Sequence, residues 1–189
     1  MPAICIPLPI ESERLLMRPF LPEVDTEAML AVYGDPDVMR FIPGGALADS
    51  GAVRSTLETH ARAQQDQGFS NWAVVERKTG RVIGDAGFNI FEPTGDIELG
   101  YTLARDCWGR GYATEAARAC LAAGLTHLVA PRIVAVVDEA NVASLRVAER
   151  IRMTRIETIE AHGRPHVLFV AARVSSRART GRDEGNLAG

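Results

Sequence analysis

The stretch that decides the fold is a glycine-containing turn between an expected strand and an expected helix: Trp108-Gly109-Arg110-Gly111-Tyr112-Ala113. The two glycines let backbone N–H groups approach a ligand without an intervening Cβ atom. A helix that begins at Tyr112 also presents unpaired N–H groups with a partial positive charge, a natural site for a diphosphate. Taken alone, the turn is equally compatible with a plain tight connection, so its surroundings have to decide.

The residues after this turn have helical spacing. Small or apolar side chains recur at intervals of three and four residues from Ala113 to Leu128, which predicts an amphipathic helix of about four turns. Pro131 cannot continue such a helix, so we expect the helix to stop before it.

Expected strands lie on both sides of this unit. Residues 71–77 and 81–88 form a predicted hairpin, and residues 97–103 add a third antiparallel strand before the turn. After the helix, residues 133–137 form a predicted buried strand and residues 141–152 a predicted helix. This alternation of strand and helix indicates a locally parallel pair.

The rest of the chain supplies further expected elements. They are a strand over 13–19, a helix capped by Asp25 and stopped by Gly34-Asp35-Pro36, a helix capped by Ser50 and reaching about Gln67, and two final strands over 154–160 and 166–174. We expect a single domain over residues 1–174. Residues 175–189 are rich in Ser, Arg and Gly, and we expect them to form a disordered tail.

Composition narrows the class of protein. A chain of 189 residues with 47% hydrophobic and 24% charged residues is typical of one globular domain. The net charge of −3 offers no overall basic field, so we expect no direct nucleic-acid binding. No apolar run is long enough to cross a bilayer, which favours a cytoplasmic protein without membrane association. Cys5, Cys107 and Cys120 lack the spacing of a zinc or redox site, so we expect reduced thiols and no metal.

Two other phosphate-binding turns do not fit these residues. A dinucleotide-binding turn needs three glycines after a first strand in a parallel unit, whereas the strands before Gly109 are expected to be antiparallel. A P-loop needs Lys and Ser or Thr after its second glycine, where this chain has Tyr112 and Ala113. Both alternatives are therefore excluded.

Several blocks of the sequence together resemble the GNAT acetyltransferase superfamily, and most closely its ribosomal-protein N-acetyltransferase branch (RimJ/RimL-like). The resemblance covers roughly residues 10 to 174. Its motifs are the runs 13–19, 35–41, 79–84, Ile97-Glu98-Leu99-Gly100-Tyr101, Trp108 to Ala116 and Asn141-Val142-Ala143-Ser144. Several ordered blocks with sensible gaps are far more specific than the glycine turn alone.

The resemblance implies an α+β fold with a mixed, mostly antiparallel sheet of seven strands, splayed after the fourth strand and flanked by about four helices. The pantetheine arm of acetyl-CoA, the expected co-substrate, would lie in the opening, and its pyrophosphate would lie on the glycine turn. The residues so implied in cofactor binding are Tyr101, Thr102, Leu103, Gly109, Arg110, Gly111, Tyr112, Ala113, Thr114, Asn141 and Ser144.

Glu98 is the candidate general base for acetylation of an amine, which must lose a proton before it can attack a thioester. Strand alternation places its side chain on the face opposite Ile97 and Leu99. If that face lines a cleft, burial raises the pKa of its carboxyl toward neutrality. The competing interpretation is an ordinary solvated glutamate on a strand.

Asn141 and Ser144 lie one helical turn apart at the start of a predicted helix. By composition alone they are ordinary capping residues. The resemblance implies instead that Asn141 contacts the cofactor arm and that Ser144 is a candidate acid for the departing thiolate. Both interpretations are carried forward.

The resemblance weakens at Arg152, where similar proteins have a glycine that ends this helix. A residue other than glycine in a left-handed conformation costs on the order of 1 kcal/mol. The geometry of the next strand is therefore an open question at this point.

The sequence predicts an enzyme that acetylates a primary amine by direct attack in a ternary complex. The acceptor is either a protein N-terminus, a ribosomal protein among the candidates, or a small amine. A catalytically weak acyl-CoA sensor is the alternative. The oligomeric state is left open, although dimers are frequent among similar proteins.

Overall fold

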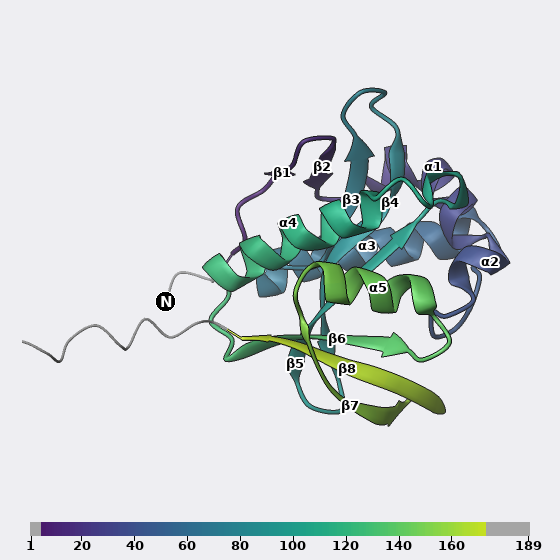
Figure 1. The fold of residues 1–189 in the computed structure, drawn as a ribbon. Coiled ribbons are helices and arrows are strands. Elements are labelled where there is room, and N and C mark those ends of the chain that lie inside the picture. Colours follow the sequence, from purple (N-terminus) through teal and green to yellow (C-terminus); the bar gives the residue numbers. More distant parts are fainter. Residues whose placement is uncertain (1–4, 173–189) are drawn as a thin grey trace, which may run out of the picture.

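The computed structural model describes residues 5–172 and shows one mixed sheet with helices on both faces (Figure 1). In chain order its elements are β1 (Ile10–Glu11), β2 (Leu15–Arg18), α1 (Pro22–Tyr33), α2 (Pro36–Met39), α3 (Ser50–Gln67), β3 (Asn71–Glu76), β4 (Val82–Phe91), β5 (Asp96–Leu103), the 3₁₀ turn η1 (Arg105–Cys107), α4 (Tyr112–His127), β6 (Arg132–Asp138), α5 (Val142–Arg150), β7 (Thr154–Ala161) and β8 (Arg164–Ala172). None of the helices in this range is long and apolar enough to cross a membrane.

The expected fold class is confirmed, with two differences of count. Within residues 5–172 the sheet has eight strands in the order β1-β2-β3-β4-β5-β6-β8-β7, rather than seven, and five helices rather than about four. The added strand β1 has only two residues and the added helix α2 only four. Elements this short do not show a periodic pattern, so sequence reasoning missed them.

The sheet opens between β5 and β6. These strands pair in parallel, as predicted, but only at Ile97↔Ile133 and Glu98↔Val134. Beyond these pairs β5 continues to Leu103 and β6 to Asp138 without pairing to each other. Because β1 adds a strand, the predicted splay follows the fifth strand in the chain instead of the fourth.

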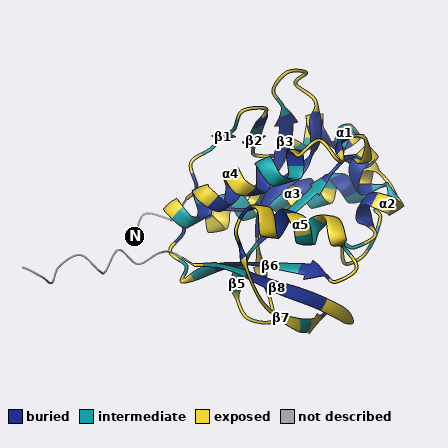
Figure 2. Cartoon of the chain, viewed as in Figure 1, coloured by how far each residue is buried: buried dark blue, intermediate teal, exposed yellow. Residues whose placement is uncertain are grey.

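Helix α4 holds the sheet together across this opening. Its Gly124 lies so close to the sheet that an added Cβ atom would stand 2.5 Å from Cζ of Phe88 on β4 and 2.8 Å from Cδ1 of Ile133 on β6. Helix α1 covers the opposite face, where Tyr33 donates a hydrogen bond to Asp85 of β4. Figure 2 shows that the strands between these helices are largely buried, whereas the edge strand β7 is mostly exposed.

Two predicted helix caps are wrong. Helix α1 begins at Pro22, and Asp25 lies inside it, where it accepts hydrogen bonds from the Leu21 N–H and the Arg18 guanidinium. Helix α3 is capped by Asp49, which accepts from the Ala52 N–H at 2.9 Å, and Ser50 is its first residue. No side chain caps α1, and the residue before Ser50 caps α3, which sequence spacing alone does not reveal.

The glycine turn has the backbone that its residues suggest, and the end of α5 has an unusual one. Gly109 and Gly111 have φ angles of 73° and 80°, and α4 begins at Tyr112 as expected. Arg152 takes the left-handed conformation with φ 65° that a glycine would adopt without strain. Strand β7 nevertheless begins at Thr154 and pairs with β8. The predicted tail over 175–189 and the end of the last predicted strand lie outside the described residues.

Candidate active site

Two cavities of about 500 Å³ each meet at the opening between β5 and β6. The turn cavity lies against the glycine turn and α5, and the sheet cavity lies over β4 and β5 beneath the segment 39–47. Six residues line both: Phe41, Ile42, Tyr101, Thr102, Asn141 and Ser144. A molecule in one cavity can therefore react with a molecule in the other at this junction.

The turn cavity contains nearly all of the expected cofactor residues. Gly109, Gly111, Tyr112, Ala113 and Thr114 line it at the N-terminus of α4, where backbone N–H groups are unpaired. Arg110, in contrast, is not among the described residues that line this cavity. Sequence reasoning had placed Arg110 among the residues that would bind the cofactor, with its positive charge beside the diphosphate.

Two arginines that sequence reasoning missed line the turn cavity instead. Arg146 and Arg150 lie four residues apart on α5, and therefore on one face of that helix. Their spacing in the sequence was the available signal. Together with the α4 N-terminus they give this cavity the positive character that a diphosphate requires.

A clamp from the N-terminal part of the chain holds the turn in place. Arg14 donates to the Arg110 carbonyl at 3.0 Å and to the Glu115 carboxylate at 2.7 Å, and its guanidinium lies 4.5 Å from the centre of the Tyr112 ring. Glu115 also accepts from the Ser12 hydroxyl at 2.8 Å. Although burial opposes it, these hydrogen bonds lower the pKa of Glu115, which keeps the clamp ionised.

One face of β4 and β5 forms the floor of the sheet cavity. The cross-strand pairs Asp85↔Thr102, Gly87↔Gly100 and Asn89↔Glu98 alternate along these strands, so their side chains share that face. The two glycines leave the centre of the floor without side chains. A Cβ atom added at Gly100 would meet only Asn89 Nδ2, at 3.8 Å, so the space above this residue is open.

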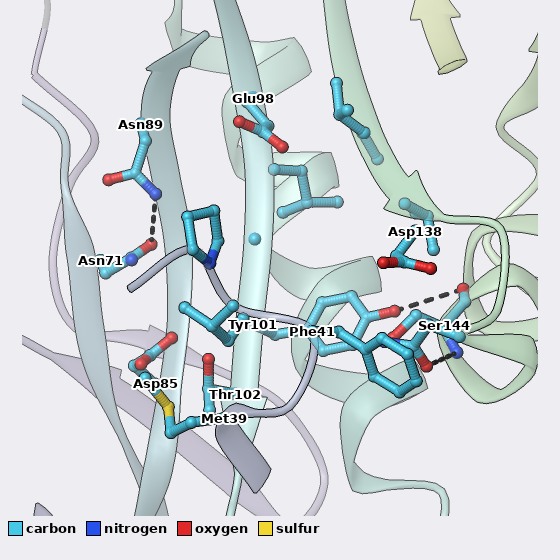
Figure 3. A pocket seen from close by; sticks show the side chains of 18 of the residues that line it. Met39, Phe41, Asn71, Asp85, Asn89, Glu98, Tyr101, Thr102, Asp138 and Ser144 are labelled. Carbon is cyan, nitrogen blue, oxygen red and sulfur yellow. Dashed lines mark hydrogen bonds between the residues drawn. The ribbon is translucent and has the colours of Figure 1, made fainter. Parts of the chain in front are cut away.

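Glu98 lines the sheet cavity on the face that strand alternation predicts (Figure 3). Burial raises the pKa of its carboxyl from 4.5 to about 7, and a hydrogen bond from the Val136 backbone opposes this shift. Val136 belongs to β6, so the Glu98 carboxylate reaches across the opening where the strands no longer pair. A carboxyl with this pKa exchanges protons readily near neutral pH.

Asp85 is a second carboxyl group in this cavity that the sequence did not single out. It is 2% exposed, and the Tyr33 hydroxyl donates to it at 2.5 Å. Burial raises its pKa from 3.8 to about 7, against the effect of hydrogen bonds from Tyr33 and the Thr102 backbone. Its position beneath α1 depends on contacts between segments distant in sequence.

Asn141 and Ser144 lie at the junction of the cavities. Asn141 caps α5 by accepting from the Ser144 N–H at 3.2 Å, so the capping interpretation holds, and both residues also line both cavities. The Tyr101 hydroxyl donates to the Ser144 carbonyl at 3.4 Å and so bridges β5 and α5. Figure 3 shows this contact at the side of the cavity opposite Asp85 and Asn89.

The remaining candidate groups have other surroundings. Cys107 and Cys120 are buried free thiols, as expected of packing residues. Trp108 is 51% exposed and lines the turn cavity, and its indole N–H donates to the Leu103 carbonyl at 2.9 Å. That carbonyl already has a partner, so the Tyr101 and Thr102 backbone is the more accessible part of the expected pantetheine contact.

Within residues 5–172, His, Cys, Asp and Glu form no group of three or more suited to a metal ion.

Comparisons with known proteins agree with this geometry. The family model described as acetyltransferase (GNAT) domain matches residues 14–154. The uncharacterized protein YkkB of Bacillus subtilis (strain 168) is 36% identical over 140 residues, which are 73% of this chain and 80% of YkkB.

Two solved structures extend the comparison to the fold. The acetyltransferase (GNAT family) from Bacillus anthracis superposes with a TM-score of 0.76 at 27% identity, over 87% of this chain and 98% of that one. RimL, a ribosomal L7/L12 alpha-N-protein acetyltransferase solved with coenzyme A, gives a TM-score of 0.74 at 16% identity, over 88% and 98% of the two chains. At this identity the second likeness shows the shared fold alone.

Proposed function

The chain belongs to the GNAT acetyltransferase family, and from this premise we propose that it transfers the acetyl group of acetyl-CoA to a primary amine by direct attack in a ternary complex. The observation that carries the proposal is the junction of the two cavities. One cavity presents a helix N-terminus with two arginines, and the other presents a carboxyl group with a pKa of about 7.

The turn cavity is the proposed site of acetyl-CoA. Backbone N–H groups at Gly109 to Thr114 would bind the diphosphate, with Arg146 and Arg150 adding charge. The pantetheine arm would follow the unpaired edge of β5 beside Tyr101 and Thr102 toward the junction. The thioester carbonyl would then accept hydrogen bonds from backbone N–H groups, which stabilise negative charge as it develops on that oxygen.

The sheet cavity is the proposed site of the amine. An aliphatic amine has a pKa of about 10 and arrives protonated, so Glu98 takes one proton from it directly or through a water. The nitrogen lone pair then forms a bond to the carbonyl carbon, and the carbon–sulfur bond breaks. The nitrogen loses its second proton as the amide forms, and the thiolate of CoA receives a proton from solvent or from the Ser144 hydroxyl, which solvent then reprotonates.

The test is a thiol-release assay with acetyl-CoA and a panel of amines and peptide N-termini. We expect CoA release that depends on the acceptor and rises with pH through about 7, as the Glu98 carboxyl loses its proton. Tight binding of acetyl-CoA without turnover on any acceptor would instead support the sensor alternative. The Arg152 conformation does not favour that alternative, because β7 and β8 form after it.

A further inference from the structure

The two cavities differ sharply in charge. Three carboxyl groups line the sheet cavity, one from each of three strands: Asp85 on β4, Glu98 on β5 and Asp138 on β6. No arginine or lysine stands among the described residues of its lining. An acceptor with a single amine group needs at most one of these carboxyl groups, the one that removes its proton.

Asp138 is the member of this group whose surroundings are incomplete. It is 6% exposed, and its Oδ1 accepts from the Ala140 N–H at 2.9 Å. Its Oδ2 is buried and has no hydrogen-bond partner in the described part of the chain. Nη1 of Arg164 forms an ion pair with it at 3.0 Å, from a side chain that is 48% exposed, but this contact does not supply a hydrogen bond. A buried carboxylate oxygen in this state is destabilised unless a donor reaches it.

Asp138 lies close to the proposed reacting centre. Glu98 accepts from the Val136 backbone, and Asp138 follows Val136 by two residues on β6, about 7 Å along the strand and on the same face. Figure 3 shows the Asp138 carboxyl beside the junction, on the opposite side of the cavity from Asp85. A ligand that spans Glu98 and Asp138 is therefore short.

The walls between these carboxyl groups suit a short hydrocarbon chain. Gly100 leaves the floor open, and Phe41, Ile42 and Leu47 cover the cavity with apolar side chains. The volume of about 500 Å³ is that of a site for a small molecule.

We propose that the acceptor is a small amine that carries a second cationic group, and that Asp138 binds this second group through Oδ2. This rests on the proposed function, since it assigns the amine to the sheet cavity. One ammonium group loses a proton to Glu98 and a second proton to solvent as it becomes an amide, and the thiolate of CoA takes up a proton. The second ammonium stays charged on Asp138, so the product leaves with one positive charge.

Three acceptors of equal length test this inference by CoA release: 1,4-diaminobutane, 1-aminobutane and 4-aminobutanoate. We expect kcat/KM for the diamine to exceed that for the monoamine by about 10-fold or more, because a charge-assisted hydrogen bond to a buried carboxylate is lost in the monoamine. The amino acid, whose carboxylate would face Asp138, should react most slowly. Equal rates for all three, or a faster reaction with a neutral peptide N-terminus, would overturn the inference and leave the proposed function intact.

The variant Asp138→Asn keeps an oxygen for the Ala140 N–H and removes the charge. It should abolish the preference for the diamine, so that kcat/KM for 1,4-diaminobutane falls to about the value for 1-aminobutane in the same variant. The control Asp66→Asn makes the same change on an exposed residue of α3 outside both cavities, and it should keep the preference. Retention of the preference in Asp138→Asn would contradict the assignment.

Calorimetry supplies a readout that does not require turnover. The protein loaded with CoA should bind 1,4-diaminobutane more tightly than 1-aminobutane by about 10-fold, and Asp138→Asn should remove this difference. If CoA binds and the diamine binds selectively but no acceptor is acetylated, the proposed function fails and the inference on the ligand stands. If the two amines bind equally, the inference fails.

Discussion

The turn cavity and the sheet cavity have similar volumes but are built in different ways. The turn cavity presents backbone N–H groups of one contiguous segment, 108–114, with arginines from the next helix beside them. The sheet cavity is made of side chains from β3, β4, β5 and β6 and from the segment 39–47. Backbone recognition leaves a motif in the sequence, whereas recognition by side chains from many elements does not. This explains why the donor is readable from the chain and the acceptor is not.

The largest expected effect belongs to the sheet cavity. Glu98→Gln removes the proposed base and keeps the shape of the side chain, so kcat should fall by roughly 100-fold or more. The dissociation constant of acetyl-CoA, measured by calorimetry, should change little, because Glu98 does not line the turn cavity. Glu92→Gln, an exposed turn residue, serves as the matched control. An unchanged kcat in Glu98→Gln would remove this residue from the mechanism.

A second prediction concerns the stability of the sheet cavity. The folded protein holds a proton on Asp85 up to a pH of about 7, above the usual value of 3.8, so native stability falls as the pH rises through this window. Asp85→Asn should therefore raise the free energy of unfolding by roughly 2 kcal/mol at pH 8. The gain should shrink as the pH is lowered and vanish below about 4.

Chemical denaturation of both proteins at pH 5 and pH 8 measures this difference. An asparagine keeps one oxygen for the Thr102 N–H, and its amide can donate to the Tyr33 hydroxyl, so the packing should be preserved. A variant that is less stable than the native protein at pH 8 would show that the Asp85 carboxylate is not the destabilising group.

The arginines of α5 test the other side of the comparison. Arg146→Gln combined with Arg150→Gln should raise KM for acetyl-CoA by about 10-fold and leave kcat nearly unchanged, because their contacts to phosphate are the same before and during the reaction. The effect should weaken as salt is added. Arg62→Gln with Arg155→Gln, two exposed residues outside both cavities, is the matched control. A fall in kcat at unchanged KM would contradict this assignment.

The smallest effect is expected outside both cavities. Arg152→Gly relieves a left-handed backbone conformation and should stabilise the fold by about 0.5–1 kcal/mol, because the relief of this strain exceeds the opposing entropy that glycine gains in the unfolded chain. Activity should not change. Thermal unfolding and the CoA-release rate measure the two quantities, and a loss of stability would show that Arg152 makes a contact worth more than its strain.

The sequence predicted the parts of the fold that repeat with a regular period. The helix from Tyr112, the strand that carries Glu98 and the parallel pair at Glu98 and Val134 all follow from spacing. The short strand β1 and the caps of α1 and α3 could not be predicted from spacing, because single contacts determine where these features form. In the site, local spacing found Glu98 and the glycine turn. Asp85 and Asp138 became candidates only when pairing across strands brought them to the same cavity.

The most direct test of the account is a crystal structure with a bisubstrate analogue, in which the sulfur of CoA is joined through an acetyl linker to an amine. We expect the diphosphate on the backbone of residues 109–114, the sulfur at the junction beside Tyr101 and Ser144, and the amine nitrogen within a hydrogen bond or one water of the Glu98 carboxylate. A diphosphate bound outside the turn cavity, or an amine that does not enter the sheet cavity, would contradict the claim that the two cavities meet at one point of transfer.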